Sequence, residues 1–213
     1  MKVGTAFVGV AMMAVCAGAG PATFDDAKTG ELPTGWTSGV TGKGEPKWAV
    51  VADESAPSRP NVLKQSGKAT YAVALKDGSA LKNGFVEVKF KAVEGREDQA
   101  AGVLWRAKDA DNYYVCRANA LEDNVVLYKS VAGKRSSLPI VGRKGGYGVE
   151  AKVAPQTWHT LRVEFVGDRF TVIFNGKRLF DVEDATFSDA GRVGLWTKAD
   201  SVTLFDDFGC GEK

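Results

Sequence analysis

The sequence is poor in the residues that many catalytic sites require. Its 213 residues include a single histidine, His159, and three cysteines. One histidine excludes a metal site built from several histidines, and it excludes a catalytic histidine pair. A Ser-His-Asp hydrolase would have to use His159, yet no Gly-x-Ser-x-Gly motif accompanies it. The sequence therefore does not indicate a serine hydrolase.

The chain also lacks a strong net charge and a long apolar run. With 28 Lys and Arg against 26 Asp and Glu, the formal net charge is +2, whereas nucleic-acid binding needs an excess of clustered cations. The apolar run at residues 3–17, which follows Lys2, is shorter than the roughly 20 residues of a spanning helix. We interpret residues 1–22 as a signal peptide cleaved near residue 19 or 22, which predicts a secreted or periplasmic protein that leaves the membrane. The alternative is an N-terminal membrane anchor.

Two cysteines, Cys116 and Cys210, remain after the predicted signal peptide. In an oxidising compartment they can form one disulfide. The alternative is that Cys116, which lies in an apolar segment, is a buried small residue. Both interpretations stay open at the level of sequence.

No segment after residue 22 places apolar residues at helical spacing. Residues 85–91 instead alternate, with Val86, Val88 and Phe90 on one face and charges on the other. Residues 170–180 form two apolar runs separated by Asn-Gly, which is a strong signal for a tight hairpin. Roughly a dozen such segments, separated by turn residues, predict one all-β domain over residues 23–213.

Several segments together resemble a known family. They read FDD, LPTGW, GVLWR and NYYVCRANALEDNVVLYK, at residues 24–26, 32–36, 102–106 and 112–129. The chain resembles secreted concanavalin A-like domains related to laminin-G-like modules and to the bacterial 3-keto-disaccharide hydrolase domain. The resemblance implies a jelly-roll sandwich of two curved antiparallel sheets, with ligands on the concave face of one. It does not imply one activity, because this fold hosts lectins, glucanases, lyases and binding modules.

The run at residues 112–129 supplies the candidate ligand site. As a strand, residues 113–119 place Tyr113, Arg117 and Asn119 on one face, and Asn124 and Tyr128 follow on the next strand. Aromatic rings stack on the C–H faces of sugars, and Arg and Asn hydrogen-bond hydroxyls. Arg106 ends a neighbouring apolar run and is a further candidate. The predicted sugar-binding face therefore comprises Arg106, Tyr113, Arg117, Asn119, Asn124 and Tyr128. The alternative is that these groups only solvate an exposed sheet.

Catalytic carboxylates and metal ligands are harder to assign. Laminarinase-like enzymes of this fold carry Glu-x-Asp-x-Glu on one strand, and the nearest match, residues 181–185, fails at Ala185. Catalytic residues therefore stay unassigned. Asp109 and Asp111 lie in an oxygen-rich turn that suits a structural Ca²⁺, although acidic turns are common without metal.

Three functions remain open from these residues. The first is a monomeric carbohydrate-recognition domain for an oligo- or polysaccharide, and the second is a glycoside hydrolase. The third is a laminin-G-like adhesion module that binds protein. A pair of carboxylates facing one pocket would favour the enzyme, and a large apolar patch would favour adhesion. Under the first hypothesis, Arg117→Ala or Tyr128→Ala should abolish glycan binding and leave the melting temperature nearly unchanged.

Overall fold

The structure, a computed structural model, describes residues 20–213. The proposed cleavage near residue 19, and almost all of the predicted signal peptide, lie outside this range. Fifteen strands and no helix occur in the described residues. Within the same range no helix is long and apolar enough to cross a membrane.

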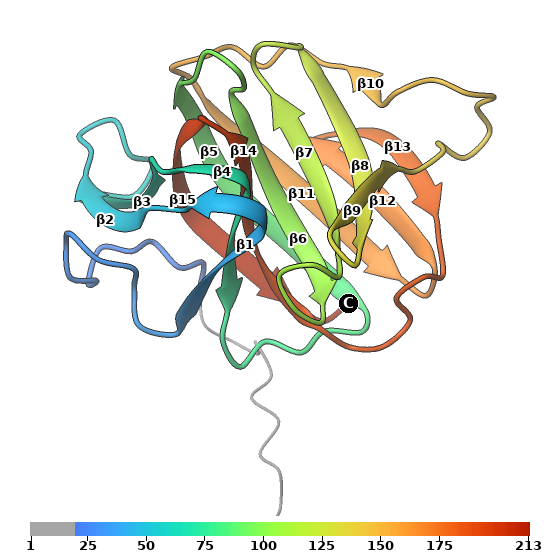
Figure 1. The fold of residues 1–213 in the computed structure, drawn as a ribbon, viewed down its shortest axis with the longest axis horizontal. Helices are drawn as coiled ribbons and strands as arrows, with labels where there is room; N and C mark the ends of the chain where they lie inside the picture. Colours follow the sequence, from blue (N-terminus) through green and yellow to red (C-terminus); the bar gives the residue numbers. More distant parts are fainter. Residues whose placement is uncertain (1–19) are drawn as a thin grey trace, which may run out of the picture.

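The strands form two antiparallel sheets (Figure 1). The inner sheet has eight strands: β1 (Trp36–Glu45), β4 (Lys68–Lys76), β14 (Arg192–Ala199), β6 (Ala100–Ala107), β7 (Tyr113–Asn119), β8 (Asn124–Val131) and β10 (Val149–Glu150), with β9 (Lys134–Ser137) also paired to β8. The outer sheet has seven strands: β13 (Lys177–Glu183), β12 (Arg169–Phe174), β11 (Trp158–Val166), β5 (Gly84–Glu94), β15 (Val202–Gly211), β3 (Asn61–Gln65) and β2 (Trp48–Ala52). The predicted all-β sandwich is confirmed.

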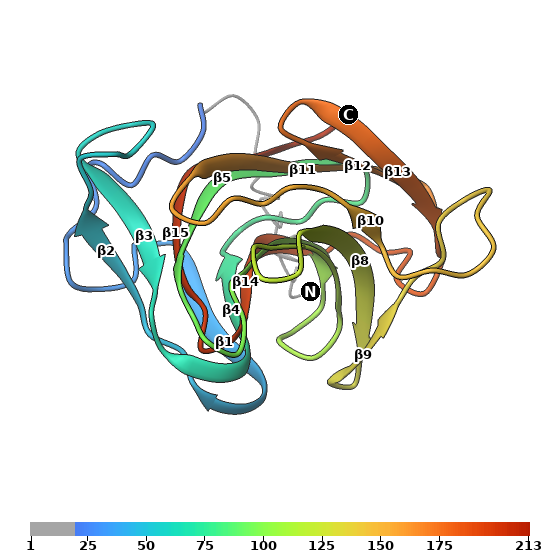
Figure 2. The same cartoon turned by 90° about the horizontal axis from the view of Figure 1, so that it is seen from above.

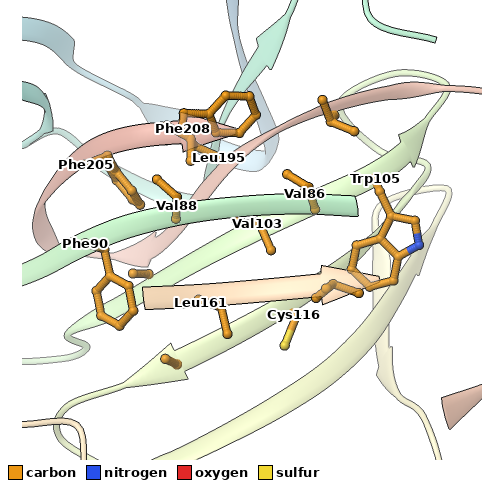
Figure 3. Close-up of a cluster of buried hydrophobic side chains, with 14 of the residues drawn as sticks. Val86, Val88, Phe90, Val103, Trp105, Cys116, Leu161, Leu195, Phe205 and Phe208 are labelled. Carbon is orange, nitrogen blue, oxygen red and sulfur yellow. The ribbon is translucent and has the colours of Figure 1, made fainter. Parts of the chain in front are cut away.

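The core between the sheets follows from the alternation in the sequence. Val86, Val88 and Phe90 of β5 are fully buried and meet residues such as Val103 and Trp105 of β6 (Figure 3). Removing this apolar area from water is the main stabilising contribution to folding. The predicted inward face of residues 85–91 is therefore correct.

The predicted hairpin also forms, between β12 and β13. Its turn residues Asn175 and Gly176 have φ angles of 48° and 75°. Both angles lie in the left-handed region that a two-residue hairpin turn requires, which asparagine and glycine adopt at the lowest cost.

Cys116 lies on β7 and packs into the core between the sheets. It is a free thiol, so the predicted bridge to Cys210 is wrong. Burial raises the pKa of the Cys116 thiol above its usual range. Cys116 is therefore the buried small residue that the second interpretation describes.

Both sheets curve in the same direction, and the inner sheet lies within the arc of the outer one (Figure 2). The face of the inner sheet that points away from the outer sheet is called the concave face below. This face carries an apolar layer of its own, separate from the main core. Its members come from five neighbouring strands, β4, β14, β6, β7 and β8, and include Val73, Leu104, Val115 and Val126, each at most 1% exposed. The concave face therefore carries packed, buried side chains and is not simply a solvent-exposed sheet surface.

Candidate ligand-binding face

Four aromatic side chains gather on the concave face. This aromatic cluster consists of Tyr71 of β4, Tyr113 of β7, Tyr128 of β8 and Trp196 of β14. The rings of Tyr71 and Trp196 stack with centroids 5.2 Å apart and planes 26° apart. The indole Nε1 of Trp196 donates a hydrogen bond to Oη of Tyr113 at 3.2 Å. Tyr71 is partly exposed and the other three are buried, so Tyr71 presents the cluster to solvent.

Arg135 of β9 lies across this cluster. It pairs with Ser130 in the β8–β9 ladder, which places its side chain on the same face as Tyr128. The centre of its guanidinium lies 4.2 Å from the ring centroid of Tyr128, 4.7 Å from Tyr71 and 5.5 Å from Trp196. Cation–π attraction therefore holds the side chain in place. Sequence reasoning missed Arg135, because the polar run Lys-Arg-Ser-Ser shows no alternation that would mark β9 as part of the sheet.

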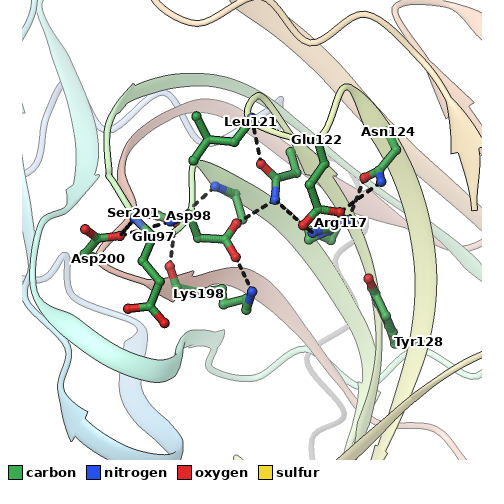
Figure 4. A network of polar contacts seen from close by, with 12 residues as sticks. Glu97, Asp98, Arg117, Leu121, Glu122, Asn124, Tyr128, Lys198, Asp200 and Ser201 are labelled. Atoms are coloured by element: carbon green, nitrogen blue, oxygen red, sulfur yellow. Dashed lines mark hydrogen bonds and ion pairs between the residues drawn. The ribbon is translucent and has the colours of Figure 1, made fainter. Parts of the chain in front are cut away.

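An ion pair between a buried arginine and a partly exposed glutamate lies beside the aromatic cluster. Arg117 is fully buried, and its Nη1 and Nη2 donate to the two carboxylate oxygens of Glu122 at 2.9 and 3.0 Å. Nη2 also donates to Oδ1 of Asn124 at 2.6 Å (Figure 4). The hydrogen bonds from Arg117 lower the pKa of Glu122 from 4.5 to about 2. Glu122 is therefore an ionised structural partner at neutral pH.

The same network continues to the neighbouring strand. Nδ2 of Asn119 donates to Asp98 at 2.6 Å and to Glu122 at 3.0 Å. The second carboxylate oxygen of Asp98 pairs with Nζ of Lys198 on β14. These contacts join the loops at one end of β6, β7 and β14 into one polar network, shown in Figure 4. Two of its carboxylates, Glu122 and Asp98, each pair with a cation.

A hollow of about 380 Å³ opens where the aromatic cluster and the polar network meet. Tyr71 and Lys198 form part of its lining, together with Lys43 and Lys68. The hollow is wide enough for a ligand of modest size, because small-molecule sites begin at about 300 Å³. It is therefore an accessible hollow beside Tyr71.

Five of the six predicted site residues share this face or its rim: Tyr113, Arg117, Asn119, Asn124 and Tyr128. The expectation that their polar groups are solvated is wrong for four of them. Tyr113 and Arg117 are 0% exposed, Asn119 is 1% exposed and Tyr128 is 2% exposed. Their partners cannot be read from the strand pattern: Thr41 and Trp196 contact Tyr113, Arg135 lies over Tyr128, and the turn that carries Glu122 pairs with Arg117 and Asn119.

Arg106 does not belong to the concave face, and that prediction is a further error. Its backbone has a φ of 47°, beside a register shift in the pairing of β14 with β6. The irregularity turns its side chain toward the rings of Phe165 and Phe170 in the main core. Its guanidinium donates to the carbonyl oxygens of Lys82 and Phe187, at 2.7 to 3.0 Å. Arg106 therefore links the loops that contain Lys82 and Phe187 by hydrogen bonds.

The predicted metal ligands form a hydrogen-bonded turn. The carboxylate of Asp109 accepts from the backbone N–H of Asp111 at 2.8 Å and from Nδ2 of Asn112 at 2.9 Å. Among residues 20–213 no group of three or more His, Cys, Asp or Glu side chains is arranged to hold a metal ion. The turn is thus explained by hydrogen bonds within the chain.

His159 belongs to the outer sheet and is remote from the concave face in the fold. Its Nε2 lies 3.0 Å from the carbonyl oxygen of Ala154, and its Nδ1 lies 3.0 Å from Nδ2 of Asn175. Both ring nitrogens therefore have partners within the chain, which fits a structural histidine.

Comparisons with known proteins agree with this architecture. A carbohydrate binding module, CBM66, from Bacillus subtilis superposes with a TM-score of 0.67 and 20% identity, covering 84% of this chain and 96% of that one. A protein of unknown function with a galectin-like fold from Bacillus subtilis gives 0.55 and 11%, with coverages of 83% and 89%. The β-glucanase of Bacillus licheniformis gives 0.53 and 11%, with 87% and 95%. At these identities the likeness establishes the fold alone.

No curated protein matches the sequence significantly. A family model does match, over residues 22–208, and it describes a 3-keto-alpha-glucoside-1,2-lyase-like domain. This confirms the resemblance drawn from the sequence motifs, and the matched range covers almost all of the described residues. The chain belongs to the family of 3-keto-alpha-glucoside-1,2-lyase-like domains.

Proposed function

We propose that the protein is an exported carbohydrate-binding domain whose ligand occupies the concave face at the hollow beside Tyr71. The observation that carries the proposal is the aromatic cluster, in which one partly exposed ring borders a hollow lined with polar side chains. An aromatic face takes the C–H side of a sugar ring, while charged and amide groups fix its hydroxyls. The similarity to a carbohydrate binding module over nearly the whole chain supports this assignment.

Binding is favoured over glycoside hydrolysis by the state of the carboxylates. A glycosidase needs two carboxyl groups, one of them a general acid with a raised pKa. On the concave face, Glu122 has a pKa lowered to about 2 by Arg117, and Asp98 holds Lys198. Glu122 is therefore not suited to donate a proton at neutral pH.

The second candidate is an enzyme, and the family match over residues 22–208 favours it. A 1,2-lyase would have to remove a proton next to the keto group of an oxidised sugar, which needs a free base. Incubation with a 3-keto-glucoside and chromatography of the products tests this directly. Release of the aglycone at a rate that scales with protein concentration would establish catalysis and displace the binding proposal.

The binding proposal is tested by calorimetric titration of purified protein with a panel of oligosaccharides. Tyr71→Ala should weaken the affinity for any bound glycan by about tenfold, because the stacking surface is lost. Trp158→Ala is the matched control, since Trp158 is also partly exposed but lies on the outer sheet. Equal affinities for wild type and Tyr71→Ala, or a loss confined to Trp158→Ala, would refute the proposed location.

A further inference from the structure

Arg135 lies on the concave face without a counter-ion among the residues that the structure describes. Among residues 20–213, Arg117 is paired with Glu122 and Lys198 with Asp98, whereas Arg135 has no acidic partner. Its Nη1 is buried and donates no hydrogen bond to any described residue. A buried guanidinium donor without an acceptor is costly, so its retention calls for a physical explanation.

The rings around Arg135 account for only part of its environment. Tyr71, Tyr128 and Trp196 attract the positive charge through their π-faces. They offer no acceptor in the plane of the guanidinium, where its N–H groups point. The three rings cover part of the guanidinium, which strengthens an interaction of Arg135 with an anion. The arrangement leaves a fixed donor edge that matches the two oxygens of a carboxylate or sulfate.

Lysines outnumber acidic residues around the hollow. Lys43, Lys68 and Lys198 line it, together with the acidic residues Glu97 and Asp200. The carboxylate of Asp200 hydrogen-bonds the adjacent loop, because its oxygens accept from the backbone N–H groups of residues 96, 97 and 98 at 3.0 to 3.1 Å. The hollow therefore offers cations with few free carboxylates, a setting that attracts anions.

We propose that the saccharide bound on the concave face is acidic, and that its carboxylate or sulfate group pairs with Arg135. This inference rests on the proposed function and adds the chemical class of the ligand. The sugar ring packs on the exposed part of Tyr71, and the anionic substituent reaches the exposed part of the Arg135 side chain. A neutral sugar of the same shape leaves the guanidinium without an anion, so the site discriminates by charge as well as by shape.

The test uses pairs of ligands that differ only in charge. Polygalacturonate is compared with its carboxyl-reduced product, and dextran sulfate is compared with dextran. Affinities are measured by calorimetry at about 0.15 M salt, where long-range attraction between exposed charges is largely screened. The proteins are wild type, Arg135→Gln, Arg135→Lys and the control Lys134→Gln, which removes the neighbouring exposed charge on the same strand. Thermal unfolding verifies that each variant is folded.

Wild type should bind at least one acidic polymer at least about tenfold more tightly than its neutral counterpart. The pair that shows the preference identifies the group as carboxylate or sulfate. Arg135→Gln should abolish the preference, Arg135→Lys should restore part of it, and Lys134→Gln should retain it.

Equal affinities for acidic and neutral partners in wild type would overturn the inference while leaving carbohydrate binding intact. A preference that survives in folded Arg135→Gln would overturn it as well. If Arg135→Gln does not fold, the wild-type comparison and Arg135→Lys still decide the question. Absence of binding to all four polymers and to the broader oligosaccharide panel would instead refute the proposed function itself.

Discussion

Replacing Glu122 by glutamine isolates the contribution of one charge to the concave face. The substitution keeps the shape of the side chain but removes the charge that faces Arg117 at 2.9 and 3.0 Å. A pKa lowered from 4.5 to about 2 means that folding favours the ionised form of Glu122 by about 3 kcal/mol, since each pKa unit is worth about 1.4 kcal/mol. The Glu122 side chain is 37% exposed, so solvent screens part of this energy, and we expect a loss of about 2 kcal/mol.

Thermal and urea unfolding of the two proteins measure this loss. For a domain of this size, about 2 kcal/mol corresponds to a fall of about 4 to 8 °C in melting temperature. Glu150→Gln is the control, because Glu150 is an exposed residue on the short strand β10. It should change stability by less than about 0.5 kcal/mol. A Glu122→Gln protein as stable as this control would refute the structural role given to the ion pair.

The pH dependence gives the same energy by an independent route. Because the pKa of Glu122 is lower in the folded state, its stabilisation is complete above about pH 4.5. The stabilisation is lost as the pH falls from 4.5 toward 2, where the folded protein begins to protonate Glu122. The difference in stability between wild type and Glu122→Gln should therefore shrink over this interval. A difference that stays constant down to pH 2 would show that the charge is not responsible.

Three further predictions concern the fold. Gly176→Ala should lower stability by about 1 kcal/mol in urea unfolding, because φ is 75° there while no atom lies within 4 Å of the added carbon; an unchanged midpoint would contradict the turn geometry. Arg106→Ala should cost about 3 kcal/mol, since the Arg106 side chain donates several buried hydrogen bonds to backbone carbonyls, and a loss below about 1 kcal/mol would argue against that role. In the native protein Cys116 should not react with a thiol reagent, and it should react after denaturation, because it is 0% exposed; rapid native labelling at Cys116 by peptide mapping would show that the core is open.

Alternation along the strands was sufficient to predict the two-sheet fold and the face on which Tyr113, Arg117 and Asn119 lie. It failed at Arg106, because an irregularity in the β6 pairing changes the phase of the strand without a sequence signal. It also failed to find Arg135, since β9 is a short polar strand paired with the end of β8. Side-chain periodicity reports the direction of each residue within a strand and carries no information about what packs over it.

Burial was the main property that the sequence could not supply. The expectation that Arg117→Ala would leave the melting temperature unchanged assumed an exposed side chain, whereas Arg117 is fully buried and paired with Glu122. Removing it would take away the cation that pairs with Glu122 and the donor to Oδ1 of Asn124. Loss of binding in that variant would therefore be mixed with loss of stability, and the partly exposed Tyr71 is the better probe of the site.

The most direct test of the proposed site is a nitrogen–proton correlation spectrum of the tryptophan side chains, recorded during titration with an acidic oligosaccharide. The indole N–H of Trp196 lies under Arg135 and donates to Tyr113 on the concave face, whereas Trp105 is buried between the sheets. Substitution of each tryptophan by phenylalanine assigns the signals. We predict a saturable shift of the Trp196 signal with the Trp105 signal unchanged. A saturable shift confined to Trp158, on the outer sheet, would place the ligand elsewhere and contradict the account.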